Sequence, residues 1–129
     1  MTIEEKIKFW KSEAIRSLAV AHDLFKSKRY IEALFFGHLA LEKLLKAKII
    51  EATNKEPVHS HDLVKLADYA AIKLDEEKIK LLAKINTYNI RTRYQDYKLA
   101  LYKKATPEFT KNELGKIEQI FNWFSNDTN

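Results

Sequence analysis

The stretch EALFFGHLALEKLLKAKII, residues 32–50, constrains the fold more than any other part of the sequence. Its apolar residues are spread nearly all round a helix, and a helix that is apolar on every side must be buried on every side. We therefore expect a helix over about 30–52 that packs either inside a bundle or against a second copy of the chain. Gly37 weakens the middle of this helix by about 1 kcal/mol relative to alanine, which indicates a close helix crossing.

Further helices are expected on both sides of this one. Thr2 and Glu5 have the spacing of a capping box at the start of the first, whose apolar residues follow at helical intervals as far as Phe25. The last helix is expected to begin at Thr106-Pro107, because proline is favoured at the first helical position. It carries an apolar stripe of Leu114, Ile117, Phe121 and Phe124.

Two shorter helices are expected between them. Ser60 or Asp62 can cap a third helix that carries Leu63, Leu66, Ala70 and Leu74. A fourth starts at Asp75, Glu76 and Glu77, since negative charge suits the positive end of a helix dipole. No strand-like alternation of useful length occurs. The predicted fold class is therefore all-α, an up-and-down bundle of about five helices that forms a single domain over residues 1–129.

The composition excludes several classes of protein. The chain has no cysteine, which excludes disulfides, a thiolate nucleophile and a cysteine zinc site. No apolar run approaches the ~20 residues of a membrane-spanning helix, and the N-terminus has acids and no apolar signal segment. We expect a cytoplasmic protein without membrane contact.

Positive charge is concentrated in one part of the chain. Residues 78–107 contain eight Lys or Arg and one acid, Asp96, so their local charge is +7, whereas the whole chain carries +5 and the remainder therefore −2. Such asymmetry favours an anionic partner such as RNA, a nucleotide or an acidic protein face. A lysine-rich solvated surface is the alternative interpretation.

Within this segment, the stretch NTYNIRTRYQDYK combines Arg91 and Arg93, two of the four arginines, with three tyrosines. A guanidinium group binds phosphate oxygens in a bidentate manner or stacks on a base, which lysine does poorly. Tyr94 and Tyr97 offer ring faces for stacking, and Asp96 can orient Arg93 or accept a hydrogen bond from a ribose hydroxyl. The alternative is an Arg–Asp ion pair, with the tyrosines filling the end of the bundle.

The apolar helix also carries three polar residues on one face. His38, Glu42 and Lys46 follow one another at four-residue intervals. A His–Glu pair at this spacing can transfer protons or bind a metal ion. A structural network of Glu42 with lysines is the alternative.

A metal site is conceivable where His59, His61 and Asp62 lie close in the sequence, but no third and fourth ligand follow nearby. We expect His61 to fix the loop before the third helix instead. No glycine-rich phosphate loop, serine elbow or pair of catalytic carboxylates is present. The sequence therefore predicts no metal and no cofactor.

Three stretches, taken in order, resemble the motifs of the HEPN domain family, named for nucleotide binding in higher eukaryotes and prokaryotes. FFGHLALEKLLKAKI resembles the family's helix with the pattern Ala-x-Glu-Lys-x-x-Lys-Ala, and HDLVKLA is similar to its His-x-Leu-x-x-Leu element. YNIRTRYQDY resembles its Tyr…Arg-Tyr-Pro-Asp element. The resemblance, from about residue 10 to 124, implies a helical bundle that commonly dimerises. It also implies frequent association with a small nucleotidyltransferase in toxin–antitoxin-like or defence systems.

The chain departs from the metal-independent ribonucleases of that family, which carry Arg, four to six residues, then His. No histidine follows Arg91 or Arg93 at that distance, and Gln95 stands where the nucleotidyltransferase-associated branch has proline. Arg16 and His22 match the motif by count, but they lie in the first helix, where a separation of six residues turns the side chains apart.

We therefore predict a HEPN-domain protein without catalytic residues that binds a nucleotide or RNA, or serves as the helical partner of a small nucleotidyltransferase. A metal-independent endoribonuclease toxin and a purely structural dimerisation domain are the alternatives. A homodimer is expected, with Phe35, Phe36 and Leu39 in its interface. The predicted nucleotide- or RNA-binding residues are Arg91, Arg93, Tyr94, Asp96, Tyr97, His38, Glu42 and Lys46.

Overall fold

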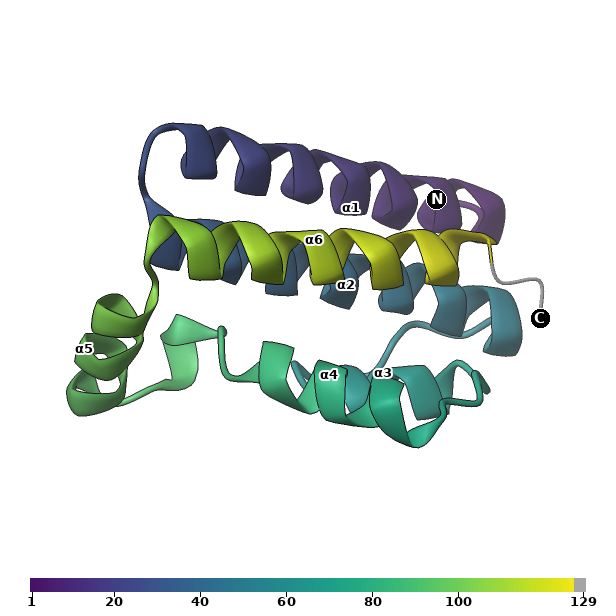
Figure 1. Cartoon of the computed structure of the whole chain (residues 1–129). Helices are drawn as coiled ribbons and strands as arrows, with labels where there is room; N and C mark the ends of the chain where they lie inside the picture. Colours follow the sequence, from purple (N-terminus) through teal and green to yellow (C-terminus); the bar gives the residue numbers. More distant parts are fainter. Residues whose placement is uncertain (127–129) are drawn as a thin grey trace.

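The computed structural model describes residues 1–126, and all regular structure in that range is helical (Figure 1). The elements are α1 (Ile3–Lys26), α2 (Tyr30–Thr53), α3 (Leu63–Tyr69), α4 (Glu76–Asn86), the short 3₁₀ helix η1 (Ile90–Thr92), α5 (Gln95–Lys104) and α6 (Pro107–Asn126). The predicted all-α bundle is therefore confirmed, with one more α-helix than expected. Within the described range no helix combines the length and the apolar character needed to cross a membrane.

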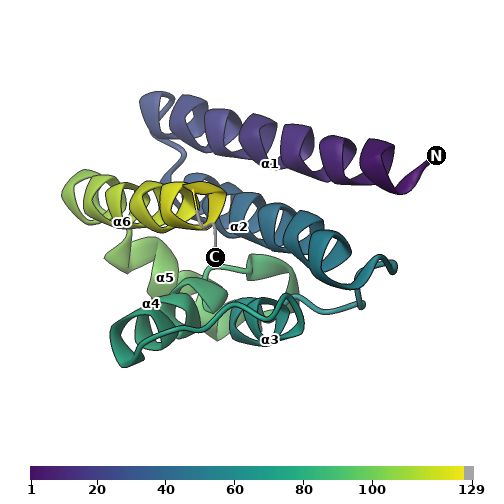
Figure 2. The same ribbon diagram turned by 90° about the vertical axis from the view of Figure 1, so that its right-hand side faces the viewer.

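The long helix α2 occupies the centre of the bundle. It packs against α1 and α6 on one side and against α3, α4 and α5 on the other (Figures 1 and 2). α1 runs antiparallel to α2, whereas α6 runs in the same direction as α2 (Figure 1). The all-round apolar surface of this helix is thus explained in large part by enclosure within one chain.

The predicted helix starts are confirmed by their caps. Thr2 and Glu5 form a reciprocal capping box, with hydrogen bonds of 2.8 and 3.1 Å between backbone and side chain. The Asp75 carboxylate accepts from the Lys78 backbone N–H (2.8 Å) at the start of α4. At α6 the Thr106 hydroxyl accepts from the Phe109 backbone N–H (3.1 Å). Each of these side chains satisfies a backbone donor that a helix start leaves unpaired.

Two expectations about the middle of the chain were wrong. The third helix ends at Tyr69, so Ala70 is its C-cap and Leu74 lies outside it. Ala71 adopts a left-handed conformation (φ 59°), and the Ile72 N–H bonds back to the Ala67 carbonyl (3.0 Å), which is the Schellman pattern that ends a helix. Helix α5 was not expected at all. Its first turn follows Tyr94, which makes no side-chain capping bond, so the usual start signal is missing.

The expected close crossing at Gly37 is confirmed, and its partner is α6. A Cβ atom on Gly37 would lie 2.7 Å from the Cδ1 atom of Ile117 and 3.5 Å from Leu114. Ile117 is completely buried, so its side chain has little room to shift. The two helices therefore approach as closely as they do because residue 37 has no side chain.

We expect Gly37→Ala to lower the free energy of unfolding by about 1 kcal/mol, even though alanine is the better helix former by a similar amount, because overpacking a core costs about 1–3 kcal/mol. Ile117→Val removes the Cδ1 atom with which the new methyl group collides. The double variant Gly37→Ala/Ile117→Val should therefore be more stable than the two single changes predict together. Urea titrations of the four proteins measure this, and strictly additive effects would contradict the collision.

Candidate functional site

The carboxylate of Glu42 lies at the centre of the site and is almost completely buried on α2. Its Oε2 atom accepts a hydrogen bond from Lys46 Nζ (3.0 Å), one helical turn further along. Its Oε1 atom lies 3.1 Å from His61 Nδ1 and 3.8 Å from a terminal nitrogen of Arg91. Side chains from three separate segments thus converge on one carboxylate.

Opposing effects act on the pKa of Glu42. Burial by itself raises this pKa, because a charge is costly away from water. The hydrogen bond and the positive charge of Lys46 outweigh burial, with a further contribution from His61, so the net pKa lies below its usual value. Glu42 is therefore ionised at neutral pH. The two positive charges of Lys46 and Arg91 exceed the single negative charge of Glu42, so the cluster has a net positive charge.

The caps at the start of α3 hold His61 in place. The Asp62 carboxylate accepts from the Val64 backbone N–H (3.0 Å). Asn86, the last residue of α4, uses both ends of its side-chain amide here: it donates to Asp62 (2.9 Å) and accepts from the Leu63 N–H (2.9 Å). One asparagine therefore joins the end of α4 to the start of α3, immediately beside His61.

The imidazole of His61 has one engaged and one free nitrogen. Nδ1 lies 3.1 Å from Glu42 Oε1 and 3.5 Å from a terminal nitrogen of Arg91. Because the contact with Glu42 is the shorter one, we assign a proton to Nδ1, which donates it in a hydrogen bond to the carboxylate. Nε2 makes no hydrogen bond to any residue in the range 1–126, and the side chain is 52% exposed. A carboxylate-oriented imidazole with an accessible nitrogen can accept or donate a proton.

His38 is the buried neighbour of this pair. Its Nε2–H donates to the backbone carbonyl of His61 (3.0 Å), which further secures the segment before α3. Its Nδ1 atom is 3.9 Å from Glu42, too far for a hydrogen bond, and has no partner among the described residues. Burial lowers the pKa of His38 by more than the charge of Glu42 raises it. The neutral form with the proton on Nε2 is therefore the folded form.

Arg91 reaches the cluster from η1 and is held on several sides. Its Nε–H donates to the Asn89 side chain (3.3 Å), and its guanidinium lies 5.1 Å from the ring centre of Phe35. One terminal nitrogen faces Glu42 and His61, while the other has no partner within residues 1–126. Because the side chain is 47% exposed, that second nitrogen is accessible to a ligand.

Arg93 has a different role from Arg91. It donates to the backbone carbonyl of Asn86 (3.1 Å) at the end of α4, where a cation suits the helix dipole, and its Nε atom is buried without a partner in the described range. Its guanidinium lies 5.1 Å from the ring centre of Tyr97. Arg93 is thus half-buried and tied to the fold, and its guanidinium lies over a tyrosine ring of the same motif.

The ion pair between Arg93 and Asp96, considered as the structural alternative, is wrong. Asp96 is exposed in the first turn of α5 and forms no ion pair with any residue in the range 1–126. Tyr94 is 89% exposed and does not fill the end of the bundle. Of the eight predicted binding residues, the structure brings together His38, Glu42, Lys46 and Arg91, while Arg93 and Tyr97 form an adjoining pair.

His61 is the residue of the cluster that sequence reasoning underestimated. It was expected only to fix the loop before the third helix, and its backbone carbonyl does so through His38. Its contact with Glu42 spans 19 positions in the sequence, so no local spacing reveals it. The HDLVKLA element was the available signal, because it places His61 next to the start of the helix that packs on α2.

The remaining sequence candidates do not converge on a site. Within residues 1–126 no three His, Asp or Glu side chains lie close enough together to hold a metal ion. His59, His61 and Asp62 therefore do not form a metal site. Arg16 lies near Glu13 (3.9 Å), whereas His22 bonds to Glu118 (2.7 Å). These two residues, which match the ribonuclease motif by count, therefore have separate partners.

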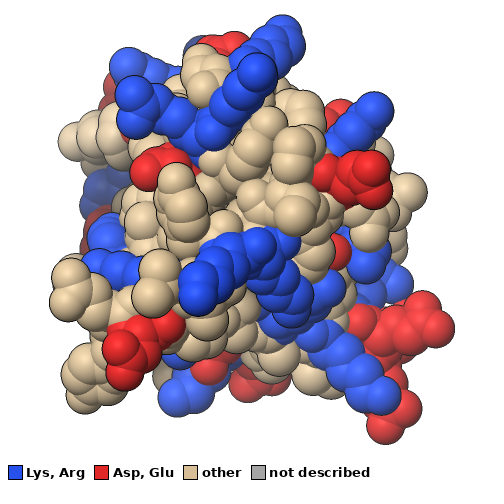
Figure 3. Space-filling model, turned by 60° about the vertical axis from the view of Figure 1, so that its left-hand side comes forward, with Lys and Arg blue, Asp and Glu red and all other residues tan. Residues whose placement is uncertain are grey.

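Lys and Arg side chains crowd the end of the molecule where α5 lies, and few acids interrupt them in the middle of that face (Figure 3). The same end carries most of the positively charged segment 78–107. Phe35, Phe36 and Leu39, the predicted dimer residues, are half-buried on α2. Phe35 is covered in part by Arg91, which places the predicted interface beside the cluster.

A known protein family matches almost the whole chain. The family model described as HEPN domain matches residues 7–127, a range that contains all members of the cluster. No curated protein and no solved structure matches the chain.

The buried His38 predicts a pH dependence of stability. Its folded-state pKa lies below the ordinary value of 6.5, so in mildly acidic solution the unfolded chain binds a proton that the folded chain does not. The free energy of unfolding should therefore fall as the pH drops below about 6.5. His38→Gln keeps a donor near the Nε2 position and removes the titrating group, so its stability should fall less over this range. Urea titrations between about pH 7.5 and 5.5 measure the slope.

The exposed His59 provides the matched control, because His59→Gln makes the same substitution at a surface position outside the cluster. Its slope should equal that of the unsubstituted protein. An unchanged slope in folded His38→Gln would refute the assignment of a neutral buried imidazole.

Proposed function

Since the chain belongs to the HEPN domain family, we propose that it is a nucleotide- or RNA-binding member and that a ligand phosphate lies against Arg91. The observation that carries the proposal is the way Arg91 is held. One side of its guanidinium is fixed by Asn89, Glu42 and the ring of Phe35, and the other side remains accessible. A planar group fixed in this manner binds phosphate oxygens with little loss of side-chain entropy.

The surroundings of Arg91 fit a ligand that is both anionic and aromatic. Lys46 and Arg91 together exceed the single negative charge of Glu42, which gives the cluster a net positive charge. The Arg93–Tyr97 stack and the exposed ring of Tyr94 supply flat surfaces that are typical of sites for unpaired bases. A simple anion would use only the positive charge of the cluster and not the aromatic rings. A nucleotide or a single-stranded RNA is therefore the better match.

A second candidate function, endoribonuclease activity, is favoured by the Glu42–His61 pair. Although no histidine follows the arginines in sequence, His61 stands 3.5 Å from Arg91 in space. The free Nε2 atom could take the proton of a ribose 2′-hydroxyl, whose oxygen would attack the adjacent phosphorus while the bond to the 5′-oxygen breaks and that oxygen takes up a proton. The reaction needs two proton transfers, and His38 is too buried to assist. Binding alone therefore ranks first.

Arg91→Gln should weaken binding of a labelled single-stranded RNA of about ten nucleotides by about tenfold, and Arg91→Lys by less, because lysine keeps the charge and loses the fork. Binding by the unsubstituted protein should weaken as salt rises from about 50 to 200 mM. Arg16→Gln is the matched control, since it removes the same charge from an exposed position on α1. Fluorescence anisotropy measures all four proteins. Equal affinities for Arg91→Gln and Arg16→Gln would exclude the proposed site.

The same RNA, incubated with the protein and a chelator, reports on cleavage. Intact RNA is expected if the protein only binds it. Cleavage that is lost in His61→Gln and kept in His59→Gln would establish the ribonuclease function instead, because the two histidines are near neighbours and only His61 touches Glu42.

We propose further that the chain forms a homodimer through the α2 face that carries Phe35, Phe36 and Leu39, and that it acts with a small nucleotidyltransferase as the family resemblance implies. The support for the dimer is that one chain covers these three side chains only in part. Leu39→Glu should then convert the dimer to a folded monomer in analytical ultracentrifugation. If the unsubstituted protein is a monomer at micromolar concentration, the homodimer is contradicted. The same face of α2 would then be the candidate binding surface for the nucleotidyltransferase.

A further inference from the structure

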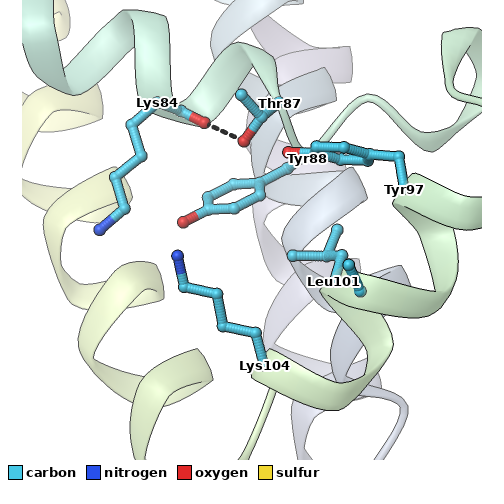
Figure 4. Close-up of a pocket in the computed structure, with 7 residues that line it drawn as sticks. Lys84, Thr87, Tyr88, Tyr97, Leu101 and Lys104 are labelled. Atoms are coloured by element: carbon cyan, nitrogen blue, oxygen red, sulfur yellow. Dashed lines mark hydrogen bonds between the residues drawn. The ribbon is translucent and has the colours of Figure 1, made fainter.

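A cavity of about 230 Å³ lies apart from the Glu42 cluster, between the C-terminal end of α4, the segment that follows it, and α5 (Figure 4). Its volume corresponds to roughly eight water molecules at ~30 Å³ each, and a pyrimidine base has about as many non-hydrogen atoms. Its lining residues are Lys84, Thr87, Tyr88, Tyr97, Ala100, Leu101 and Lys104. The Glu42 cluster contributes none of them.

One end of the cavity is polar and positively charged. The ammonium groups of Lys84 and Lys104 point toward the hydroxyl end of Tyr88 (Figure 4) and lie 5.4 and 5.2 Å from the ring centre of Phe109. Lys84 pairs with the buried Glu113 (3.1 Å). Lys104 has no carboxylate within ion-pair distance among residues 1–126. Its charge is therefore available to a ligand.

The charge of Glu113 is already balanced without Lys104. Glu113 accepts a hydrogen bond from the Tyr88 hydroxyl (2.6 Å) and pairs with Lys116 (3.3 Å) as well as with Lys84. Burial raises the pKa of Tyr88, and Glu113 raises it further, so the phenol keeps its proton and remains the donor. The polar end of the cavity thus carries a net positive charge.

The remaining walls are apolar or aromatic. Tyr97 and Leu101 lie one turn apart on α5, on the side of that helix where the Tyr88 ring lies (Figure 4), and Ala100 of the same helix also lines the cavity. The ring of Tyr97 is also the one on which the Arg93 guanidinium stacks. Tyr97 therefore lines the cavity and also contacts Arg93, which lies two residues after Arg91.

We propose that this cavity binds one nucleotide of a single-stranded RNA, with the base between Tyr97, Tyr88 and Leu101 and a phosphate at Lys104 and Lys84. This inference rests on the proposed function, because it places another nucleotide of the same strand at Arg91. It also narrows the ligand: a strand can occupy Arg91 and the cavity together, whereas a mononucleotide occupies one of them. Flat walls with cations at one end match a base and its phosphate.

Lys104→Gln should weaken binding of the RNA of about ten nucleotides by about tenfold, since it removes a phosphate contact, and Ala100→Trp should do the same by filling the cavity without a change of charge. Lys103→Gln is the matched control, because Lys103 is an exposed neighbour on α5 that does not line the cavity. Uridine monophosphate should bind much more weakly than the RNA. Circular dichroism melting curves verify that each variant is folded.

Three outcomes are decisive. Equal affinities for Lys104→Gln and Lys103→Gln, together with undiminished binding by Ala100→Trp, would overturn the cavity and leave the Arg91 site intact. A loss of binding in both cavity variants but not in Arg91→Gln would retain the cavity as a nucleotide site and exclude the proposed function at Arg91. Mononucleotide binding as tight as that of the RNA, lost in the same cavity variants, would overturn the assignment to a strand.

Discussion

The ionised carboxylate of Glu42, buried on the central helix, is the constraint that the candidate site depends on. A charge at this depth costs several kcal/mol unless partners compensate it. Lys46 comes from the same helix, but His61 and Arg91 come from segments that the chain reaches only after leaving α2. The need to satisfy one carboxylate therefore determines where the segment before α3 and the segment around η1 are placed.

A second buried carboxylate, Glu113 on α6, acts on the same segment from the other side. Tyr88 donates to Glu113, and Arg91, three residues later, faces Glu42. The residues between α4 and α5 are thus held between acids on two long helices. The two arginines therefore have different roles. Arg93 donates to the backbone at the end of α4, whereas one side of the Arg91 guanidinium stays accessible to a ligand.

The sequence predicted those features that depend on local chemistry. The capping box at Thr2, the Asp75 cap and the start of α6 follow from residues within four positions of one another. Helix α5 was missed because no capping side chain precedes it, and its apolar residues do not form a clear stripe. The cluster was predicted only in part. His38, Glu42 and Lys46 share a helix face, whereas the contacts of Glu42 with His61 and Arg91 depend on tertiary packing.

The weak internal bonding of η1 has a consequence for motion. Its backbone hydrogen bonds are long, 3.3 Å from Thr92 to Asn89 and 3.4 Å from Arg93 to Ile90, and its order comes mainly from side chains that reach other helices. The packing of α2 against α1 and α6 does not involve η1. Residues 90–92 can therefore open as a local unit while the three long helices stay folded and Tyr88 and Asn89 remain buried. The segment that carries Arg91 is thus the least self-supporting part of the site, and a ligand bound there would slow the hydrogen exchange of its amides.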